Sequence, residues 1–317
     1  MSITDKIRSI TSTGVTNTSE SRGFLQSNFV RSMPFWLPPT LLMGLFVYGG
    51  IAWNFLISLT NWTGVLDPDY SLGNLNISSY TAMLTDPQFW DATRNTILLV
   101  VVFTLLCLIL GVMLAIIVDH ILRGQGVYRT VFLLPFALSF VVTGLIWQWM
   151  YNSETGIINE LLRIFGLDFL TQSWLGDPRF KLAAIIVALT WQFTGYAMVI
   201  LLASLRTIPQ DHFDAAKVDG AGFFTTYWKL IIPQLRPAAV SAAVVLMVFS
   251  LAAFTWIFVV FGRNPGPSAD ILGVMMYRQA FAANQWAYGA ALGTVLFGIM
   301  SAIVSPYLYY QHKRGEL

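Results

Sequence analysis

Charge is scarce in this sequence of 317 residues. Only 11% of its residues are Asp, Glu, Lys or Arg, whereas soluble domains carry about 25%. Hydrophobic residues make up 56% of the chain. This balance predicts an all-α polytopic membrane protein, because a chain with so few charges is suited to lipid rather than to water. The 18 basic residues are scattered along the chain, so we expect no nucleic-acid partner.

Residues that carry chemistry are also scarce. The single cysteine, Cys107, lies within an apolar run, which excludes a disulfide framework and a cysteine-based metal site. The chain has neither GxxxxGK[ST] for nucleotide phosphates nor HExxH for zinc. Its three histidines, His120, His212 and His312, lie at or beyond the ends of apolar runs. The sequence therefore predicts no catalytic residues, no metal and no cofactor in this chain.

Long apolar runs, by contrast, are frequent, and six of them can cross a hydrocarbon core that needs about 20 residues. No Asp, Glu, Lys or Arg lies within them, which argues against a proton relay inside the membrane. The predicted spans are 35–59, 95–118, 131–151, 182–205, 238–262 and 287–310.

The basic residues indicate the orientation of these spans. With the N-terminus in the cytoplasm, twelve of the 18 Lys and Arg residues fall inside and six outside, as the positive-inside rule requires. Both termini are then cytoplasmic. We expect a cytoplasmic tail over residues 1–33, a transmembrane domain over 34–312 with a cytoplasmic loop over 207–237, and a C-terminal tail over 313–317.

The external loops contain signals for turns and short helices. Asp67-Pro68 and Asp86-Pro87 predict turns, and residues 79–84 a short helix. Residues 156–165 predict another short helix between the third and fourth spans.

The polar stretch from Pro209 to Pro237 predicts two helices joined by a turn. Asp214-Ala215-Ala216 favours the first helix, and Gly220 ends it in the left-handed conformation. Aromatic and aliphatic residues then recur at helical spacing, which predicts a second helix with one apolar face that Pro233 ends. That face consists of Phe224, Tyr227, Trp228 and Ile231. The stretch could lie on the lipid surface or bind a partner; its cytoplasmic position favours a partner.

Polar and aromatic residues within the spans indicate where a solute could pass. The amide of Gln192 needs a hydrogen-bond partner or a wet cavity in hydrocarbon. Together with Tyr196, Thr255 and Trp256 it offers the amides, hydroxyls and aromatic faces that suit a sugar. The alternative is hydrogen bonding and packing between helices.

The pattern in the cytoplasmic loop resembles the EAA loop of binding-protein-dependent ABC importer permeases. Asp214-Ala215-Ala216 is followed by Asp219-Gly220-Ala221 and then by Leu230-x-Ile232-Pro233. The family has Glu at the first position, where this chain has Asp214. Further stretches resemble the sugar branch of the family, with its maltose and glycerol-phosphate permeases: FLISLTNW at 55–62, YTAMLTDPQFWDATRNT at 80–96, RTVFLLP at 129–135 and GIIN at 156–159.

This resemblance implies a type I importer permease of the MetI-like fold, in a multi-pass position in the cell membrane of a prokaryote. The partners it implies are a second permease in a heterodimer, two cytoplasmic ATPases that bind ATP and Mg, and an extracytoplasmic substrate-binding protein. The residues implied to couple to the ATPases are Asp214, Ala215, Ala216, Asp219, Gly220, Ala221 and Pro233.

The resemblance also implies a solute pathway. Positions that line it in maltose-type members match Phe136, Phe140, Gln192, Phe193, Tyr196 and Thr255, beside which we place Trp256. Leu189 and Ala252 are apolar here and polar in the maltose permease, so a sugar other than maltose is expected. The alternatives are another solute such as glycerol phosphate, a secondary carrier that needs no ATPase, or an intramembrane enzyme. The spans contain no charged groups that would favour a phosphate-bearing solute or an ion-driven carrier, and their nucleophile, acid and metal-ligand residues do not converge as an enzyme would need.

Overall fold

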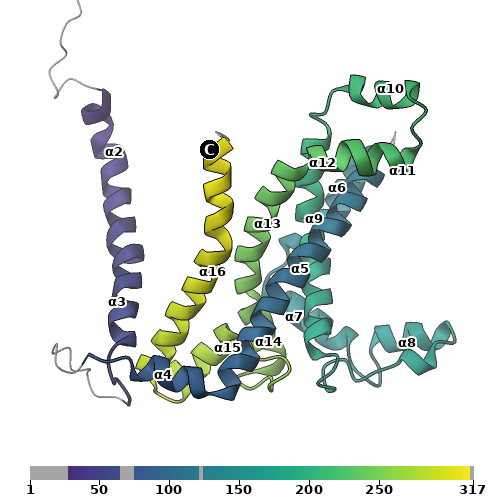
Figure 1. Cartoon of the computed structure of the whole chain (residues 1–317). Coiled ribbons are helices and arrows are strands. Elements are labelled where there is room, and N and C mark those ends of the chain that lie inside the picture. Colours follow the sequence, from purple (N-terminus) through teal and green to yellow (C-terminus); the bar gives the residue numbers. More distant parts are fainter. Residues whose placement is uncertain (1–27, 65–74, 121–123, 315–317) are drawn as a thin grey trace, which may run out of the picture. The chain divides into compact units, whose positions relative to one another are not determined.

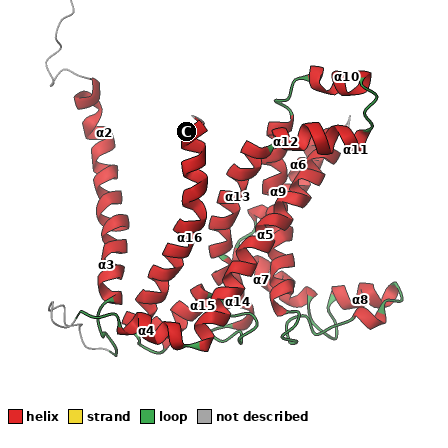
Figure 2. Ribbon diagram, viewed as in Figure 1, coloured by secondary structure: helices red, strands yellow, loops and turns green. Residues whose placement is uncertain are grey.

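The computed structural model describes residues 28–64, 75–120 and 124–314, and every regular element in these ranges is a helix or a helical turn (Figures 1 and 2). The all-α prediction is therefore confirmed for this part of the chain. The turn expected at Asp67-Pro68, the first 27 residues of the N-terminal tail and residues 315–317 lie outside the described residues.

The chain divides into two compact units, and the boundary between them along the sequence lies between Trp53 and Asn54. The first contains α2 (Asn28–Met43), a π-helical turn (Gly44–Tyr48) and the first half of α3 (Gly49–Ser58). Together these helices supply a candidate membrane span, Ser32–Ser58. Because α2 begins at Asn28, the last residues of the expected N-terminal tail are helical.

The second unit is built around two long helices, α5 (Pro87–His120) and α9 (Lys181–Leu205). Small residues bring their backbones together: a Cβ added to Gly111 of α5 would lie 2.7 Å from the Cβ of Ala197 on α9. Phe103 of α5 meets Phe193 of α9 edge to face, with ring centroids 5.7 Å apart. This pair forms the centre of the core on which the other helices pack.

The remaining helices of the second unit connect and cover this pair. α4 (Ser78–Thr85) precedes α5, and α6 (Gln125–Leu133), α7 (Phe140–Met150) and α8 (Ile157–Ile164) lie between α5 and α9 along the chain. α10 (Gln210–Val218), α11 (Phe223–Thr225) and α12 (Ile232–Gln234) form the polar loop after α9. The last are α13 (Arg236–Leu251), α14 (Ala253–Phe261), α15 (Leu272–Tyr277) and α16 (Trp286–Arg314).

Among the described residues, five continuous helical segments are long and apolar enough to cross a membrane, and one bent pair of helices raises the number to six. The predicted third span, 131–151, is not a single helix in the structure. It was expected as one helix, but it breaks between α6 and α7 with a bend of 96°. Pro135 opens a short 3-10 turn at the break, because it lacks the N–H that would continue the helix.

The two ends of the second unit carry different short helices (Figure 1). α10 stands beyond the ends of α9 and α13, whereas α8 lies at the opposite end of the unit. Both short helices that the sequence predicted between spans occur at the expected positions, as α4 and α8. α16 continues to Arg314, past the boundary expected for the C-terminal tail.

Candidate functional site

The loop after α9 begins with a short helix that ends in a defined cap. The N–H of Ala221 donates to the carbonyl of Ala216 at 2.9 Å, and the N–H of Gly220 donates to the carbonyl of Lys217 at 3.1 Å. These two bonds are the Schellman pattern, and Gly220 supplies the positive φ of 71° that it needs. The predicted turn is confirmed, and it explains why Asp219-Gly220-Ala221 follow the helix: they form its cap.

One side of α10 faces the protein and the other is exposed. Ala216 is its buried residue, and Phe213 packs against Tyr227 with ring centroids 6.2 Å apart. His212 contacts the side-chain oxygen of Gln234 through its Nδ1 at 3.1 Å. These contacts hold α10 against the segment that leads into α13.

The exposed side carries the acidic residue that replaces the family's Glu. Asp214 accepts hydrogen bonds from Lys217 at 3.1 Å and from Gln210 at 3.5 Å. The Lys217 hydrogen bond, with a smaller contribution from Gln210, lowers the pKa of Asp214. Ala215 and Asp219 are also exposed. This side of α10 is available to a partner outside the chain.

The second helix of the loop differs from the prediction in two ways. Tyr227 and Ile231 are buried, but Phe224 and Trp228 are 85% and 76% exposed, so the four residues do not share one face. Pro233 was expected to end the helix, yet it lies inside α12, and α13 follows at Arg236. The π-helical turn Thr226–Ile231 comes directly before it. Such a turn widens the backbone, which accommodates the proline without ending the helix.

A polar cavity of about 760 Å³ lies between α10 and the ends of α5 and α9. Arg206 spans it, with its Nε 3.3 Å from Asp119 and its Nη2 donating to Gln125 at 2.6 Å. The ring of His120, the last residue of α5, packs against the ring of Tyr227 with centroids 5.5 Å apart, and its Nε2 lies 3.4 Å from the Tyr227 hydroxyl. The loop is therefore joined to the end of α5 as well as to α9 and α13.

The structure brings together four of the predicted pathway residues in one aromatic cluster. Phe136 stacks on Tyr196 at 5.4 Å and meets Phe193 edge to face at 5.5 Å. Phe140 lies 5.7 Å from Phe193, again between ring centroids. Phe249 of α13, which the sequence did not single out, completes the cluster 4.9 Å from Phe193. The cluster surrounds the bend between α6 and α7.

Gln192 supports that bend directly. Its Nε2 donates to the carbonyl of Leu138 at 2.8 Å, within the break between the two helices. Its Oε1 is buried and has no hydrogen-bond partner among the described residues. Gly195, one turn further along α9, passes so close to the bend that an added Cβ would collide with the carbonyl oxygen of Phe132. Gln192 thus has both a structural bond and a free acceptor.

The two predicted pathway residues on α14 differ from each other. Thr255 is half-buried, and its N–H donates to the carbonyl of Ala252 at 3.0 Å. Trp256 is fully buried in the core formed by α5, α7, α9 and α14, and its Nε1 has no partner among the described residues. In this conformation Trp256 is a core residue rather than a residue of an open surface.

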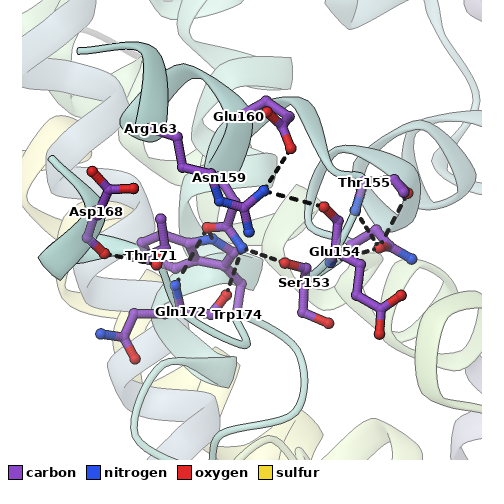
Figure 3. Close-up of polar contacts among 11 residues, drawn as sticks. Ser153, Glu154, Thr155, Asn159, Glu160, Arg163, Asp168, Thr171, Gln172 and Trp174 are labelled. Atoms are coloured by element: carbon purple, nitrogen blue, oxygen red, sulfur yellow. Dashed lines mark hydrogen bonds and ion pairs between the residues drawn. The ribbon is translucent and has the colours of Figure 1, made fainter. Parts of the chain in front are cut away.

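A further polar network lies at the end opposite α10 and depends on Asn159 of α8 (Figure 3). Asn159 is buried, and its Nδ2 donates to the carbonyls of Ser153 and Gln172 at 3.1 and 3.0 Å. Its Oδ1 accepts from the N–H of Gln172 at 3.3 Å and from Trp174 Nε1 at 2.8 Å. The last residue of GIIN therefore ties both sides of the α7–α9 connection together.

Comparison with known proteins identifies relatives along the whole chain. Residues 107–314 match the family described as binding-protein-dependent transport system inner membrane component. A xylose/arabinose import permease of Haloferax volcanii is 47% identical over 315 residues, which cover 99% of this chain and 98% of the relative. A probable ABC transporter permease of Pyrococcus horikoshii is 44% identical over 282 residues, 89% of this chain and 96% of the relative.

The fold also matches a solved structure. A chain of a bacterial ABC transporter involved in the import of the acidic polysaccharide alginate superimposes with a TM-score of 0.72 over 90% of this chain and 95% of that chain. The two sequences are 19% identical, so the similarity concerns the fold alone. The predicted type I importer fold is confirmed.

Proposed function

Because the chain belongs to the family of binding-protein-dependent transport system inner membrane components, we propose that it is the permease subunit of an ATP-driven sugar importer. In this proposal a second permease completes the pathway, two cytoplasmic ATPases supply the energy, and an extracytoplasmic binding protein delivers the solute. Both termini and α10 then face the cytoplasm. The family match over residues 107–314 is the observation that carries the proposal.

The geometry of α10 supports its role as the coupling helix. A helix that transmits force must be stiff, and α10 is capped by two backbone hydrogen bonds and joined to α12 through His212 and Gln234. Its exposed residues Asp214, Ala215 and Asp219 offer an ATPase a surface that the chain itself does not cover. Motion of α10 would reach α5 through the contact between Tyr227 and His120.

The aromatic cluster supports a neutral ring-shaped solute. Aromatic faces pack on the apolar side of a sugar ring, and Phe136, Phe140 and Tyr196 are partly exposed around the bend. The free Oε1 of Gln192 lies in the adjoining core and could accept a hydrogen bond from a hydroxyl once the helices move apart. No charged residue lies in α9 after Lys181 or in α14, so nothing in these helices favours a phosphate-bearing solute.

The relatives suggest which sugars to test first. The relative that matches over 99% of this chain is named for import of xylose and arabinose, and we propose a pentose as the solute. Diacetylchitobiose, trehalose and maltose occur in the names of relatives with 30–32% identity, so these disaccharides serve as comparisons.

Co-purification tests the proposal most directly. The tagged chain is purified from its own cell membrane, its partners are identified by mass spectrometry, and the binding protein found with it is assayed for bound sugar. We expect a second permease, an ATPase and a binding protein that retains a pentose. A homo-oligomer free of any ATPase would contradict the importer assignment, and a non-sugar ligand would contradict the solute.

A further inference from the structure

An apolar groove of about 870 Å³ runs between α5 and the α11–α12 segment. Its walls consist of aliphatic side chains, the thioether of Met113, phenyl rings, the indole of Trp228 and the ring of Tyr227. The lining residues on α5 are Leu108, Ile109, Val112, Met113, Ile116 and Ile117; those on the loop segment are Phe223, Phe224, Tyr227, Trp228 and Ile232.

The α5 wall of the groove belongs to a face of the membrane span itself. Ile109, Met113 and Ile117 are four residues apart, which places them in one row along the helix. They are 55%, 54% and 53% exposed. The helix Pro87–His120 is long and apolar enough to be a candidate membrane span, so we expect this exposed apolar row to face hydrocarbon. The groove is therefore continuous with a lipid-facing surface.

The shape of the lining favours a flexible chain over another helix. Membrane helices associate closely through Gly, Ala, Ser and Thr. α5 presents such a face to α9, with Gly111 against Ala197 and the buried Ala115 nearby. None of the residues that line the groove is small in this sense. A bulky, concave and wholly apolar wall is better matched by an acyl chain.

The mouth of the groove carries residues typical of a membrane interface. Trp228 and Phe224 remain largely exposed at one side of it, and Lys229 follows Trp228 on the exposed surface. Tryptophan is enriched at the level of the lipid headgroups, and lysine is enriched on the cytoplasmic side. The exposure of the two aromatic residues is otherwise unexplained by packing within the chain.

We propose that this groove holds one acyl chain of a membrane phospholipid as a retained ligand. The lipid comes from the leaflet on the α10 side, which is the cytoplasmic leaflet in the orientation on which the proposed function rests. The acyl chain contacts Trp228 and Ile232, while the neighbouring Ile231 and Leu235 are buried in the protein core. The lipid would then contact both α5 and the segment from Phe223 to Ile232, and so would form part of the packing between the loop that carries α10 and the membrane span.

A photocrosslinker on α5 tests this proposal. p-Benzoylphenylalanine replaces Met113 in the groove or, as the matched control, Leu105, which is exposed on the same helix outside it. The complex with its natural partners is exchanged into lipid-free detergent, irradiated and analysed by mass spectrometry. We expect about tenfold more phospholipid adduct at position 113 than at 105, as ~1.4 kcal/mol of stronger binding would give.

Filling the groove provides the second arm of the experiment. Val112→Phe narrows the groove and should remove most of the adduct at position 113, whereas Val102→Phe, the same change outside the groove, should leave it intact. Equal labelling at 113 and 105, no lipid adduct, or retention unchanged by Val112→Phe would overturn the proposal. A crosslink from position 113 to another polypeptide would show that a protein covers the groove. The experiment measures the mass of a crosslinked phospholipid and not uptake, so its result does not depend on which solute the protein transports.

Discussion

At the scale of single residues, Gly220 is the position where backbone conformation bears most directly on function. Its φ is 71°, and an added Cβ would meet no atom within 4 Å. A substitution there is therefore opposed by the backbone conformation alone, without any steric clash. Gly222, two residues away, also has open space but a φ of −70°. Replacing Gly220 tests the need for a positive φ, whereas replacing Gly222 tests only the effect of losing a glycine in this loop.

Gly220→Val should uncouple ATP hydrolysis from uptake, while Gly222→Val should leave both intact. Valine in the left-handed region costs about 1–2 kcal/mol, enough to shift the cap away from the Schellman geometry. Uptake and ATPase activity of the reconstituted complex are compared for the two variants, after assembly is confirmed by gel filtration. Normal transport by an assembled Gly220→Val complex would argue against the coupling role of α10.

A buried ion pair outside the spans gives a second residue-scale prediction. Asp270 lies 2.6 Å from Arg278, and both side chains are largely buried. Burial raises the pKa of Asp270, and the hydrogen bond and charge of Arg278 oppose that rise. Arg278→Met leaves the carboxylate unpaired, which should lower the free energy of unfolding by about 3 kcal/mol at neutral pH. Asp270→Asn combined with Arg278→Met should recover most of this loss.

The same variant should respond to pH in a defined direction. Without Arg278 the folded-state pKa of Asp270 rises further above its ordinary value of 3.8. The folded protein then binds a proton more readily than the unfolded chain, so stability falls as pH rises through the folded pKa and recovers as pH falls. Melting temperatures of Arg278→Met relative to the double variant should therefore converge at acidic pH. A constant difference across pH would contradict this account.

At the scale of elements, the bend between α6 and α7 depends on a close approach to α9. Gly195→Ala places a methyl group on the carbonyl oxygen of Phe132. The bend cannot move without losing the bond from Gln192 to Leu138, so we expect a clear fall in melting temperature. Gly298→Ala is the control, because nothing lies within 4 Å of its Cβ and alanine favours a helix by up to about 1 kcal/mol. Equal stability of the two variants would show that the bend is adaptable.

The α7–α9 connection depends on Asn159 in the same way. Asn159→Ala removes four hydrogen bonds and leaves buried partners unsatisfied, at a cost of about 3 kcal/mol. Trypsin should then cleave after Arg163 much faster, while cleavage after Arg206 stays unchanged. Glu160→Ala removes only an exposed ion pair with Arg163 and should alter cleavage little. Unchanged cleavage in Asn159→Ala would show that α8 is held by other contacts.

Sequence patterns predicted some elements and not others, for physical reasons. The spans follow from apolar runs, and the cap of α10 follows from Gly220, because both are local signals. The 96° bend does not, since it depends on Gln192 reaching Leu138, 54 positions away. The π-helical turn Thr226–Ile231 before Pro233 also escaped prediction, because the sequence stretch carries only the signal of a regular helix. The sequence marked Asn159 only as the last residue of the GIIN motif, because its four hydrogen bonds join it to residues that lie up to 15 positions away.

At the scale of the whole molecule, ion-driven carriers often use charged residues inside their spans, and the predicted spans of this chain contain none. Proteoliposomes that contain the complete complex should take up xylose or arabinose when the binding protein and ATP are present on their respective sides. A protonophore should leave the rate unchanged, because no carboxylate lies in the predicted spans to carry a proton. Uptake that persists without ATP and stops with the protonophore would favour a secondary carrier.

The length of α5 has a mechanical consequence. Its 34 residues extend about 51 Å at 1.5 Å per residue, well beyond a hydrocarbon core of about 30 Å. Its last residue, His120, touches Tyr227 in the loop that carries α10. Near its other end, Asn95 holds the carbonyls of Pro267 and Asp270 in the opposite loop. Because α5 is one continuous helix between these two contacts, a tilt imposed at the His120 end should be transmitted to the loop that Asn95 holds.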